Sequence, residues 1–325
     1  MNSLPKTGIV TLNWRNYQDT IECLESLLKQ NYPDFHIFIL ENGSGDGSAK
    51  QMEEWGRTRL GNDFFSATIK EAEGLFFNQK IVLLKSKENL GFAGGNNLVI
   101  RTAIRIGAKY VWLINNDTIQ EKNSLTALVK AAQSNDEVGM VCSKVLYFAR
   151  PDIIESIGST LIAPLGIFRH IKQGVKDSNV PPVLMEIPYV YGCSFLVRVE
   201  LINDVGLMDE RYFLLREESD WSLRARKKGW KIYSAPTSVV WHKVTHSIGK
   251  RSEIFFYYVT RNTLLFMKKH YPLFLPTTIL SMFPLVLGLI FADSLLVKWK
   301  SILRRIKMVI LGYLHFFNGR FGRLI

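Results

Sequence analysis

The stretch YVWLINNDTI, residues 110–119, is an apolar run that ends in two amides and a carboxylate. Its first five residues, Tyr110 to Ile114, are long enough for one strand, and strands this apolar are typical of parallel sheets covered by helices on both faces. The strand delivers Asn115, Asn116 and Asp117 at its carboxyl end. In open α/β sheets the ligand site lies beyond that end of the strands. The stretch therefore predicts an α/β fold and marks one edge of a binding site.

The chain before this stretch repeats the alternation of strand and helix. Short apolar runs predict three earlier strands, and helical spacing such as that of Ile21 and Leu24 fills an interval between them. The three strands are Thr7–Asn13 (TGIVTLN), Phe35–Leu40 (FHIFIL) and Lys80–Lys85 (KIVLLK). Residues 55–80 have weak periodicity and are expected to form an insertion. The pattern predicts a mixed, mainly parallel sheet flanked by helices.

The pattern after residue 119 is less regular. We expect a helix near Leu125–Ala132 and another from about Glu217 to Lys228. Strands are expected in VGMVCSKVLYF and YGCSFLVRVE, and a strand pair across WKIYSAPTSVVWH. The region from Pro151 to Pro188 is expected to be irregular.

Polar clusters follow each of the four early strands, where a nucleotide pocket would form. They are Asn13–Asn16, Glu41–Asp46, Asn89–Asn97 and Asn115–Asp117. A dinucleotide-binding fold would need G-x-G-x-x-G after the first strand, but that turn reads NWRNYQ. The later GFAGG lacks the Lys-Ser/Thr of a phosphate loop. The sequence therefore supports neither nicotinamide redox chemistry nor P-loop hydrolysis.

The composition of the 325 residues is that of a folded protein, with 47% hydrophobic and 22% charged residues. The three cysteines are widely spaced without a C-x-x-C pair, which argues against a disulfide framework or a thiolate zinc site and favours a reducing cytosol. The first ten residues do not read as a secretory signal. The net charge of +12 is concentrated after residue 220, where 18 Lys and Arg face only Glu253 and Asp293. That region could be a solvated basic surface, a nucleic-acid surface or a face for anionic lipid.

Ordered motifs from Gly8 to Arg261 resemble the inverting family 2 glycosyltransferases of GT-A fold, especially their bacterial rhamnosyltransferase-like branch. The matching stretches are VTLNWRN, LENGSGDGS, NLGFAGGNN, WLINNDT, YGCSFLVR, GLMDERYFLLREESDWSLRARKKGW, VVWHKVTHS and YYVTRN. Each motif is loose alone, but their order and spacing together are specific. The resemblance implies a GT-A fold that transfers a sugar from a nucleoside diphosphate.

The resemblance also implies a metal site for Mg²⁺ or Mn²⁺. The family's DxD element, which holds the ion on the donor diphosphate, corresponds to Asn115-Asn116-Asp117. Asp117 is the implied metal ligand, and His242 at the end of VVWH is the second. Asn115 replaces the first Asp and offers an amide oxygen or a ribose contact, without charge. Lys243 and His246 are further candidates for phosphate contacts. Such an ion neutralises the charge that develops on the leaving diphosphate.

The family's general base belongs to an acidic pair at a helix start, which falls on Glu217 and Glu218 in REESDW. Glu218 is the better match, although Asp is usual there, and Asp220 is expected to orient the acceptor or Arg224. The alternative explanation is that acidic residues stabilise a helix N-terminus through its dipole. Donor contacts implied by the family fall on residues of the polar clusters and glycine-rich loop. They are Thr11, Asn13, Glu41, Asn42, Asp46, Gly91, Gly94, Gly95, Asn97, Asn115 and Asn116. Asn97 could instead cap the helix that follows.

The last seventy residues change character. Leu273–Val297 is mostly apolar and long enough to span a bilayer, but it contains two prolines and Asp293. The next stretch, KWKSILRRIKMVILGYLHFF, is typical of a basic amphipathic helix that lies on a membrane. We expect monotopic attachment to the inner face of the cell membrane. A true span, a buried helical subdomain and a dimer interface are the alternatives.

These features predict a catalytic domain over residues 1–262, with a nucleotide-sugar half (1–118) and an acceptor half (119–262), followed by a helical region, 263–325. The expected donor is dTDP-L-rhamnose, with UDP-activated hexose, N-acetylhexosamine or galactofuranose as alternatives. The expected acceptor is a glycan or lipid-linked glycan of a cell-surface polysaccharide. From other classes, a nucleotidyltransferase and a non-catalytic nucleotide- or phosphate-binding protein remain open. Nucleic acid is not an expected partner, and an oligomer is compatible with the sequence.

Overall fold

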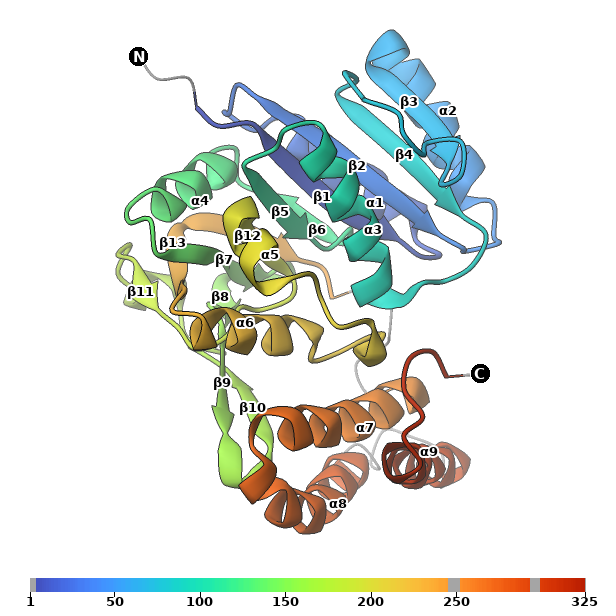
Figure 1. The fold of residues 1–325 in the computed structure, drawn as a ribbon, viewed down its shortest axis with the longest axis vertical. Coiled ribbons are helices and arrows are strands. Elements are labelled where there is room, and N and C mark those ends of the chain that lie inside the picture. The colour runs from blue at the N-terminus through green and yellow to red at the C-terminus, as the bar shows by residue number, and fades with distance from the viewer. Residues whose placement is uncertain (1–3, 245–251, 293–298, 325) are drawn as a thin grey trace.

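A computed structural model describes residues 4–244, 252–292 and 299–324. Its main sheet has the strand order β11-β13-β7-β12-β5-β1-β2-β4-β3, with β6 paired to β13 and β8 paired to β7. Helices cover both faces, and three C-terminal helices lie together below the sheet (Figure 1). The predicted α/β class, with a mixed and mainly parallel sheet, is confirmed.

The N-terminal strands form the parallel half of the sheet. β1 (Thr7–Asn13) lies between β2 (Phe35–Asn42) and β5 (Tyr110–Ile114), and β4 (Ile81–Ser86) follows β2. Alternate residues of each strand enter opposite cores because side chains in a strand point to opposite faces. The connecting helices are α1 (Tyr17–Leu27), α2 (Ser48–Leu60), α3 (Gly91–Arg105) and α4 (Ser124–Ala132). One core packs against α3, and the other packs against α1 and α4.

The predicted insertion at residues 55–80 is wrong in part. This region completes α2 and adds the edge strand β3 (Phe64–Thr68), which runs parallel to β4. Phe64 packs in one core while Phe65 and Ala67 pack in the other, and these few apolar positions give little pattern in sequence. A turn-rich connection then leads to β4.

The second half of the sheet is mixed. β12 (Ser194–Arg198) lies antiparallel between β5 and β7 (Val138–Tyr147), and the short β6 (Thr118–Gln120) pairs with β13 (Lys231–His242). The predicted strand pair across WKIYSAPTSVVWH is a single strand, β13, whose register shifts between Ala235 and Val239 where it pairs with β7. The predicted helix at Glu217 is α6 (Glu217–Lys227), and the seven-residue α5 (Val199–Val205) precedes it.

The region expected to be irregular contains short strands. β8 (Arg150–Ser156) pairs with β7, β9 (Ser159–Ile162) and β10 (Ile167–His170) form a hairpin, and β11 (Met185–Glu186) pairs with β13. The pairing of β8 with β7 is broken by two register shifts. Such irregular pairing leaves little alternation to read in the sequence.

Three helices end the chain: α7 (Glu253–His270), α8 (Leu275–Ala292) and α9 (Trp299–Phe317). The expected boundary at residue 262 falls inside α7. This helix contributes Phe256 and Leu264 to a core shared with α8 and α9, and Phe266 to another core shared with Tyr212. Through α7, the helical region is therefore packed against the part of the chain that contains Tyr212.

Candidate functional site

The pairing of β6 with β13 brings Asp117 and His242 together. Thr118 lies opposite His242 in the antiparallel pair, so Asp117, the residue before Thr118, lies beside the end of β13. Oδ1 of Asp117 lies 3.2 Å from Nε2 of His242, and both side chains are buried. The two residues predicted as metal ligands therefore converge at the carboxyl edge of the sheet.

Glu155 of β8 completes this cluster, and it was not predicted from the sequence. Its Oε2 lies 2.7 Å from Nδ1 of His242, and its Oε1 accepts a hydrogen bond from the hydroxyl of Tyr191 at 3.2 Å. Burial alone would lower the pKa of His242, but Cys193, Asp117 and Glu155 outweigh it and raise that pKa well above its ordinary value. An N–H at Nδ1 that donates to Glu155 leaves Nε2, on the side of Asp117, as the ligating nitrogen of the neutral ring.

This donor set fits a divalent cation that the donor diphosphate helps to hold. Two ligands at right angles, each about 2.1 Å from an ion, are about 3 Å apart, close to the separation of Asp117 and His242. Over residues 4–244, 252–292 and 299–324, no group of three or more His, Cys, Asp or Glu side chains could hold a metal. If an ion binds here, Asp117 and His242 would supply two ligands, and phosphate oxygens and water would have to supply the rest.

The two asparagines before Asp117 differ in their surroundings. Asn115 is half-buried, and its backbone N–H donates to the carbonyl of Cys193 at 2.9 Å. Asn116 is buried, and its Nδ2 donates to Oγ1 of Thr20 at 2.8 Å. Asn116 therefore anchors the loop to α1 rather than facing a ligand, while Asn115 keeps an accessible amide.

The residues predicted to hold the nucleotide base lie at the ends of β1 and β2. Oε1 of Glu41 accepts a hydrogen bond from the backbone N–H of Ser44 at 2.9 Å. Thr11 and Asn13 are fully buried, and Oδ1 of Asn13 accepts from Oγ1 of Thr20 at 2.8 Å. Asn13 thus holds the first turn of α1, whereas Oγ1 of Thr11 has no hydrogen-bond partner among the described residues; their predicted donor contacts stay a prediction.

Asn42 and Asp46 also bind the protein itself. Oδ1 of Asn42 accepts from the backbone N–H of Leu90 at 2.9 Å, and its Nδ2 donates to the carbonyl of Gly91 at 3.2 Å. Oδ1 of Asp46 accepts from the hydroxyl of Ser48 at 2.6 Å and from its N–H at 3.0 Å, and these hydrogen bonds, the hydroxyl first, lower the pKa of Asp46. Asp46 is exposed and keeps its second oxygen for a ligand, whereas Asn42 ties two loops together.

The glycine-rich stretch is helical, since α3 begins at Gly91. Gly91 has φ +75°, and a Cβ there would lie 2.4 Å from the carbonyl oxygen of Phe213. A Cβ on Gly95 would press on Leu12 and Leu40. These two glycines serve close packing, not the predicted approach to the donor. A Cβ on Gly94 would meet only side chains at ordinary contact distance, so nothing in the packing requires glycine there.

Asn97 does not cap α3, because it lies in the second turn. Its Nδ2 donates to the carbonyl of Met208 and to Oε1 of Glu210, both at 2.9 Å, and its Oδ1 accepts from the N–H of Met208 at 3.0 Å. The predicted donor contact is therefore replaced by a link between the two halves of the catalytic domain.

The acidic pair opens α6, as predicted. Glu217 is buried, and its Oε2 has no hydrogen-bond partner among the described residues. Burial, followed by the charge of Glu218, raises the pKa of Glu217 well above its ordinary value. Glu218 is half-buried and accepts from Oγ of Ser219 at 3.2 Å; burial raises its pKa too. A half-buried carboxyl with a raised pKa matches a general base, whereas the enclosed Glu217 does not.

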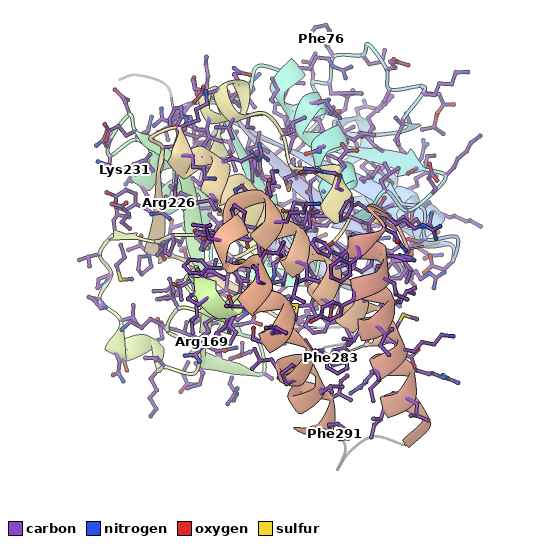
Figure 2. All side chains as sticks on the ribbon, turned by 60° about the horizontal axis from the view of Figure 1, so that its bottom comes forward. Phe76, Arg169, Arg226, Lys231, Phe283 and Phe291 are labelled. Atoms are coloured by element: carbon purple, nitrogen blue, oxygen red, sulfur yellow. The ribbon has the colours of Figure 1, made fainter. Side chains whose placement is uncertain are left out.

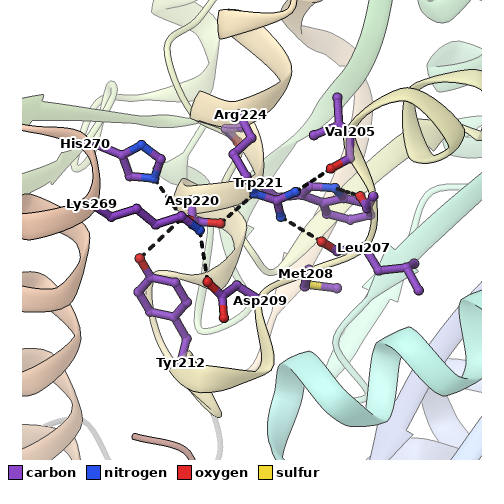
Figure 3. A network of polar contacts seen from close by, with 12 residues as sticks. Val205, Leu207, Met208, Asp209, Tyr212, Asp220, Trp221, Arg224, Lys269 and His270 are labelled. Carbon is purple, nitrogen blue, oxygen red and sulfur yellow. Dashed lines mark hydrogen bonds and ion pairs between the residues drawn. The ribbon is translucent and has the colours of Figure 1, made fainter. Parts of the chain in front are cut away.

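Asp220 is the centre of a buried polar network (Figure 3). Its Oδ2 accepts from Nε of Arg224 at 2.8 Å, and its Oδ1 lies 2.7 Å from both Nζ of Lys269 and Nε2 of His270. Burial alone would raise the pKa of Asp220, but these partners lower it to about 2. The side chain is fully buried, which excludes contact with an acceptor and leaves the predicted orientation of Arg224 as its role.

The candidate phosphate contacts after β13 are not both described. Nζ of Lys243 pairs with Oδ1 of Asp19 at 2.6 Å and with Glu22, both on α1. This double ion pair holds Lys243 against α1. His246 lies outside the described residues.

Solved structures share this architecture. The mannosyltransferase PcManGT from Pyrobaculum calidifontis, in complex with GDP-Man and Mn²⁺, is similar with a TM-score of 0.55 at 13% identity, over 97% of this chain and 88% of its own. TarS 1-349 of S. aureus is similar with a TM-score of 0.53 at 14% identity, over 95% and 80%. At such identities the likeness shows the fold, and it confirms the GT-A architecture.

Curated relatives match at higher identity over part of their length. The N-acetylglucosaminyl-diphospho-decaprenol L-rhamnosyltransferase of Mycobacterium tuberculosis is 27% identical over 185 residues, which is 52% of this chain and 60% of the relative. The low-salt glycan biosynthesis hexosyltransferase Agl10 of Haloferax volcanii is 24% identical over 152 residues, covering 46% and 47%. These matches therefore span about half of each relative.

A family model decides the class. The model described as "Glycosyltransferase like family 2" matches residues 5–263, which include Asp117, Glu218 and His242. A nucleotidyltransferase or a non-catalytic phosphate-binding protein is therefore no longer a competing explanation. The chain belongs to the family 2 glycosyltransferases.

Proposed function

We propose that this glycosyltransferase is metal-dependent and inverting, and that it moves L-rhamnose from dTDP-rhamnose to a lipid-linked glycan in cell-surface polysaccharide synthesis. The observation that carries the proposal is the convergence of Asp117 and His242, with Nε2 and Oδ1 3.2 Å apart at the carboxyl edge of the sheet. The choice of an L-rhamnosyl group and a lipid-linked acceptor is supported by the name of the M. tuberculosis relative.

Asp117 and His242 would hold Mg²⁺ or Mn²⁺, and the imidazole ligand favours Mn²⁺, the softer of the two. When bound, the ion supplies positive charge against the leaving diphosphate. The protein's own part is orientation: Glu155 fixes the ring of His242, and Asn116 fixes the loop that carries Asp117. Asn115 adds an amide near the ion without a second negative charge.

Glu218 would take the proton of the acceptor hydroxyl as that oxygen attacks the anomeric carbon. The attack forms the new glycosidic bond, breaks the bond to the diphosphate on the opposite face, and inverts the configuration. The half-buried position of Glu218 supports this role, because the carboxyl is partly open to an acceptor.

Glu41 would select the base of the donor nucleotide. Its Oε1 is engaged by Ser44, while its Oε2 accepts no hydrogen bond from the described residues. That oxygen can accept the imide N–H of thymine or of uracil. For this reason UDP-hexose, UDP-N-acetylhexosamine and UDP-galactofuranose are the second candidate donors.

The helical region supports work on a lipid-linked acceptor. Among the described residues, one helix, Pro272–Phe291, is long and apolar enough to cross a membrane, and only 22% of it is buried. Phe283 and Phe291 lie on the part of α8 that extends away from the sheet (Figure 2). The exposed apolar residues of α8 and α9 are Leu280, Phe283, Leu285, Leu289, Phe291, Leu303, Ile310, Leu314 and Phe317. Arg304 and Lys307 are exposed on the same helix pair. We infer a monotopic, peripheral attachment to the cytoplasmic leaflet.

The test is a donor panel with the purified protein. dTDP-rhamnose and UDP-sugars are each supplied with Mn²⁺ and a polyprenyl-diphosphate-linked acceptor, and nucleoside diphosphate release and product anomeric configuration are measured. Transfer from dTDP-rhamnose with inversion is expected. Asp117→Ala should abolish metal-dependent release, Glu218→Gln should bind donor without turnover, and the exposed Asp136→Ala should behave as wild type. Transfer with retention, or full turnover by Glu218→Gln, would overturn the mechanism.

A further inference from the structure

The segment that enters α6 has an unusual backbone. Phe213, Leu215 and Arg216 have φ values of +58°, +69° and +81°, and Glu217 follows directly. Residues with a Cβ rarely adopt the left-handed region, and a cluster of them persists only where the surrounding structure enforces it. The turn of residues 212–216 therefore needs an external support, and it sets where the acidic pair begins.

Asn262 of α7 supplies part of that support. It is fully buried, and its Nδ2 lies within hydrogen-bond distance of three carbonyl oxygens of the turn: Tyr212 at 2.7 Å, Leu214 at 2.7 Å and Leu215 at 2.9 Å. In this way one amide engages three carbonyls of the turn, of which that of Tyr212 also accepts from the N–H of Leu214 at 2.6 Å. Few other side chains could replace it, because the contacts need two N–H groups on one planar nitrogen.

Arg261 extends the same contact. It is fully buried and has no ion pair with a carboxylate among the described residues. Its Nη2 donates to the carbonyls of Arg211 and Tyr212 at 3.0 and 3.1 Å, and its Nη1 donates to that of Gly322 at 2.7 Å. Its Nε donates to Oδ1 of Asn262 at 2.8 Å, which fixes the orientation of the amide. Nη1 also donates to the hydroxyl of Tyr257 at 3.2 Å, so backbone, amide and hydroxyl oxygens satisfy the buried guanidinium.

The turn also touches the nucleotide half. The carbonyl of Phe213 accepts from the backbone N–H of Phe92 at 2.7 Å, at the start of α3. On the other side, Lys269 and His270 at the end of α7 bind Asp209 and Asp220, which flank the turn (Figure 3). The start of α6 is therefore held between α3 and α7.

We propose that Arg261 and Asn262 are positioning residues for the general base: they hold the left-handed turn that places Glu218 in the site. This rests on the proposed function, in which Glu218 is the base. Neither residue touches the reacting atoms. Their effect is confined to geometry, so their loss should lower kcat while leaving the affinity for donor intact.

The first test is Asn262→Ala in the full chain, with the exposed Asn318→Ala as the matched control. We expect Asn262→Ala to lower kcat about 100-fold, the order of effect of displacing a catalytic group by about 1 Å. The affinity for dTDP and UDP with Mn²⁺, measured by calorimetry, should stay within about threefold, as expected when only transition-state contacts are lost. Hydrogen exchange should speed up in peptides covering residues 209–221 and stay unchanged in β1 and β5.

The second test is rescue. Leu215→Gly introduces a residue that adopts φ +69° without strain, so the turn should depend less on Asn262. In the Asn262→Ala background we expect Leu215→Gly to restore kcat about tenfold and to slow exchange over residues 209–221. A gain of this kind is not expected if Asn262 only stabilises the fold as a whole.

The outcomes separate the two proposals. Unchanged kcat and unchanged exchange over 209–221 in Asn262→Ala would overturn the positioning role, as would a parallel loss of donor affinity with faster exchange throughout the sheet. Normal turnover by Glu218→Gln would show that Glu218 is not the base, but it would not affect the hydrogen exchange measured over residues 209–221. Faster exchange confined to residues 209–221 would still establish that Asn262 holds this turn.

Discussion

Glu155 and His242 are joined by a 2.7 Å contact between Oε2 and Nδ1, on the side of the imidazole away from Asp117. The two residues are far apart in sequence and meet because β7 pairs with both β8 and β13. A carboxylate on the second nitrogen fixes the ring and increases its basicity as a ligand. The candidate metal site thus includes a residue that would not touch the metal.

Glu155→Gln is expected to weaken Mn²⁺ binding in the presence of nucleoside diphosphate by about 10- to 100-fold, because the amide supports the ring less strongly. Calorimetry or electron paramagnetic resonance of bound Mn²⁺ measures this directly. The exposed Glu186→Gln on β11 is the control, with unchanged affinity. Equal Mn²⁺ affinity in both variants would show that His242 needs no support from Glu155.

The raised pKa of Glu218 predicts the shape of the pH profile. A general base works only when ionised, and burial moves protonation of Glu218 to a pH above the ordinary 4.5. As pH falls, kcat should therefore decline at a higher pH than for an exposed glutamate. Initial rates at saturating donor from pH 4.5 to 8 measure this. A flat profile down to pH 4.5 would argue against Glu218 as base.

Asp220→Asn tests the buried network separately from catalysis. Removing the carboxylate shared by Arg224, Lys269 and His270 leaves the Arg224 guanidinium without its ion pair, while Lys269 keeps Asp209; the expected cost is about 3 kcal/mol in the free energy of unfolding. Urea denaturation at pH 7 measures it. Asp204→Asn, which removes an exposed ion pair with Lys228, is the control and should change the free energy of unfolding far less.

The same network has a defined pH window. The pKa of Asp220 is about 2 in the folded protein and 3.8 without these contacts. The stability it contributes is therefore complete above about pH 4 and is lost as pH falls toward 2. Between those values the wild type should lose stability relative to Asp220→Asn. A constant difference between the two proteins across this range would mean that Asp220 is not ionised in the fold.

Most strands of the N-terminal half, and the residues at their carboxyl ends, could be predicted from the sequence. Asp117 stood out because it follows a buried strand, whereas Glu218 and His242 were implied by the family resemblance; the structure places Glu218 at the start of α6 and His242 at the end of β13. Glu155 could not be predicted, because β8 pairs irregularly with β7 and the role of Glu155 depends on its contact with His242 of β13. Arg261 was part of a recognised motif, but its function depends on carbonyls of a distant turn, which have no signature in sequence.

Errors in the predicted donor site have a shared physical cause. A polar residue after a strand reads the same whether it faces a ligand or a neighbouring backbone. Asn42 and Asn97 bind the backbone, at Leu90 and Met208 respectively. Gly95 was predicted to allow close approach of the donor, and in the structure the side chains of Leu12 and Leu40 pack against it. Burial and partners decide such cases, and both are properties of the fold.

The apolar face of α8 and α9 predicts binding to anionic vesicles. Leu314→Glu with Phe317→Glu should reduce binding to phosphatidylglycerol vesicles by more than about tenfold, since each buried side chain contributes about 1.5–3 kcal/mol. Leu75→Glu with Phe76→Glu is the matched control, because these residues are exposed on the nucleotide half, and Phe76 lies far from Phe283 and Phe291 (Figure 2). Flotation with vesicles, at low and high salt, measures binding. Equal losses of binding in both variants would mean that the added negative charge, not the loss of apolar surface on α9, is responsible. Retained binding in both variants would exclude this face as the membrane contact.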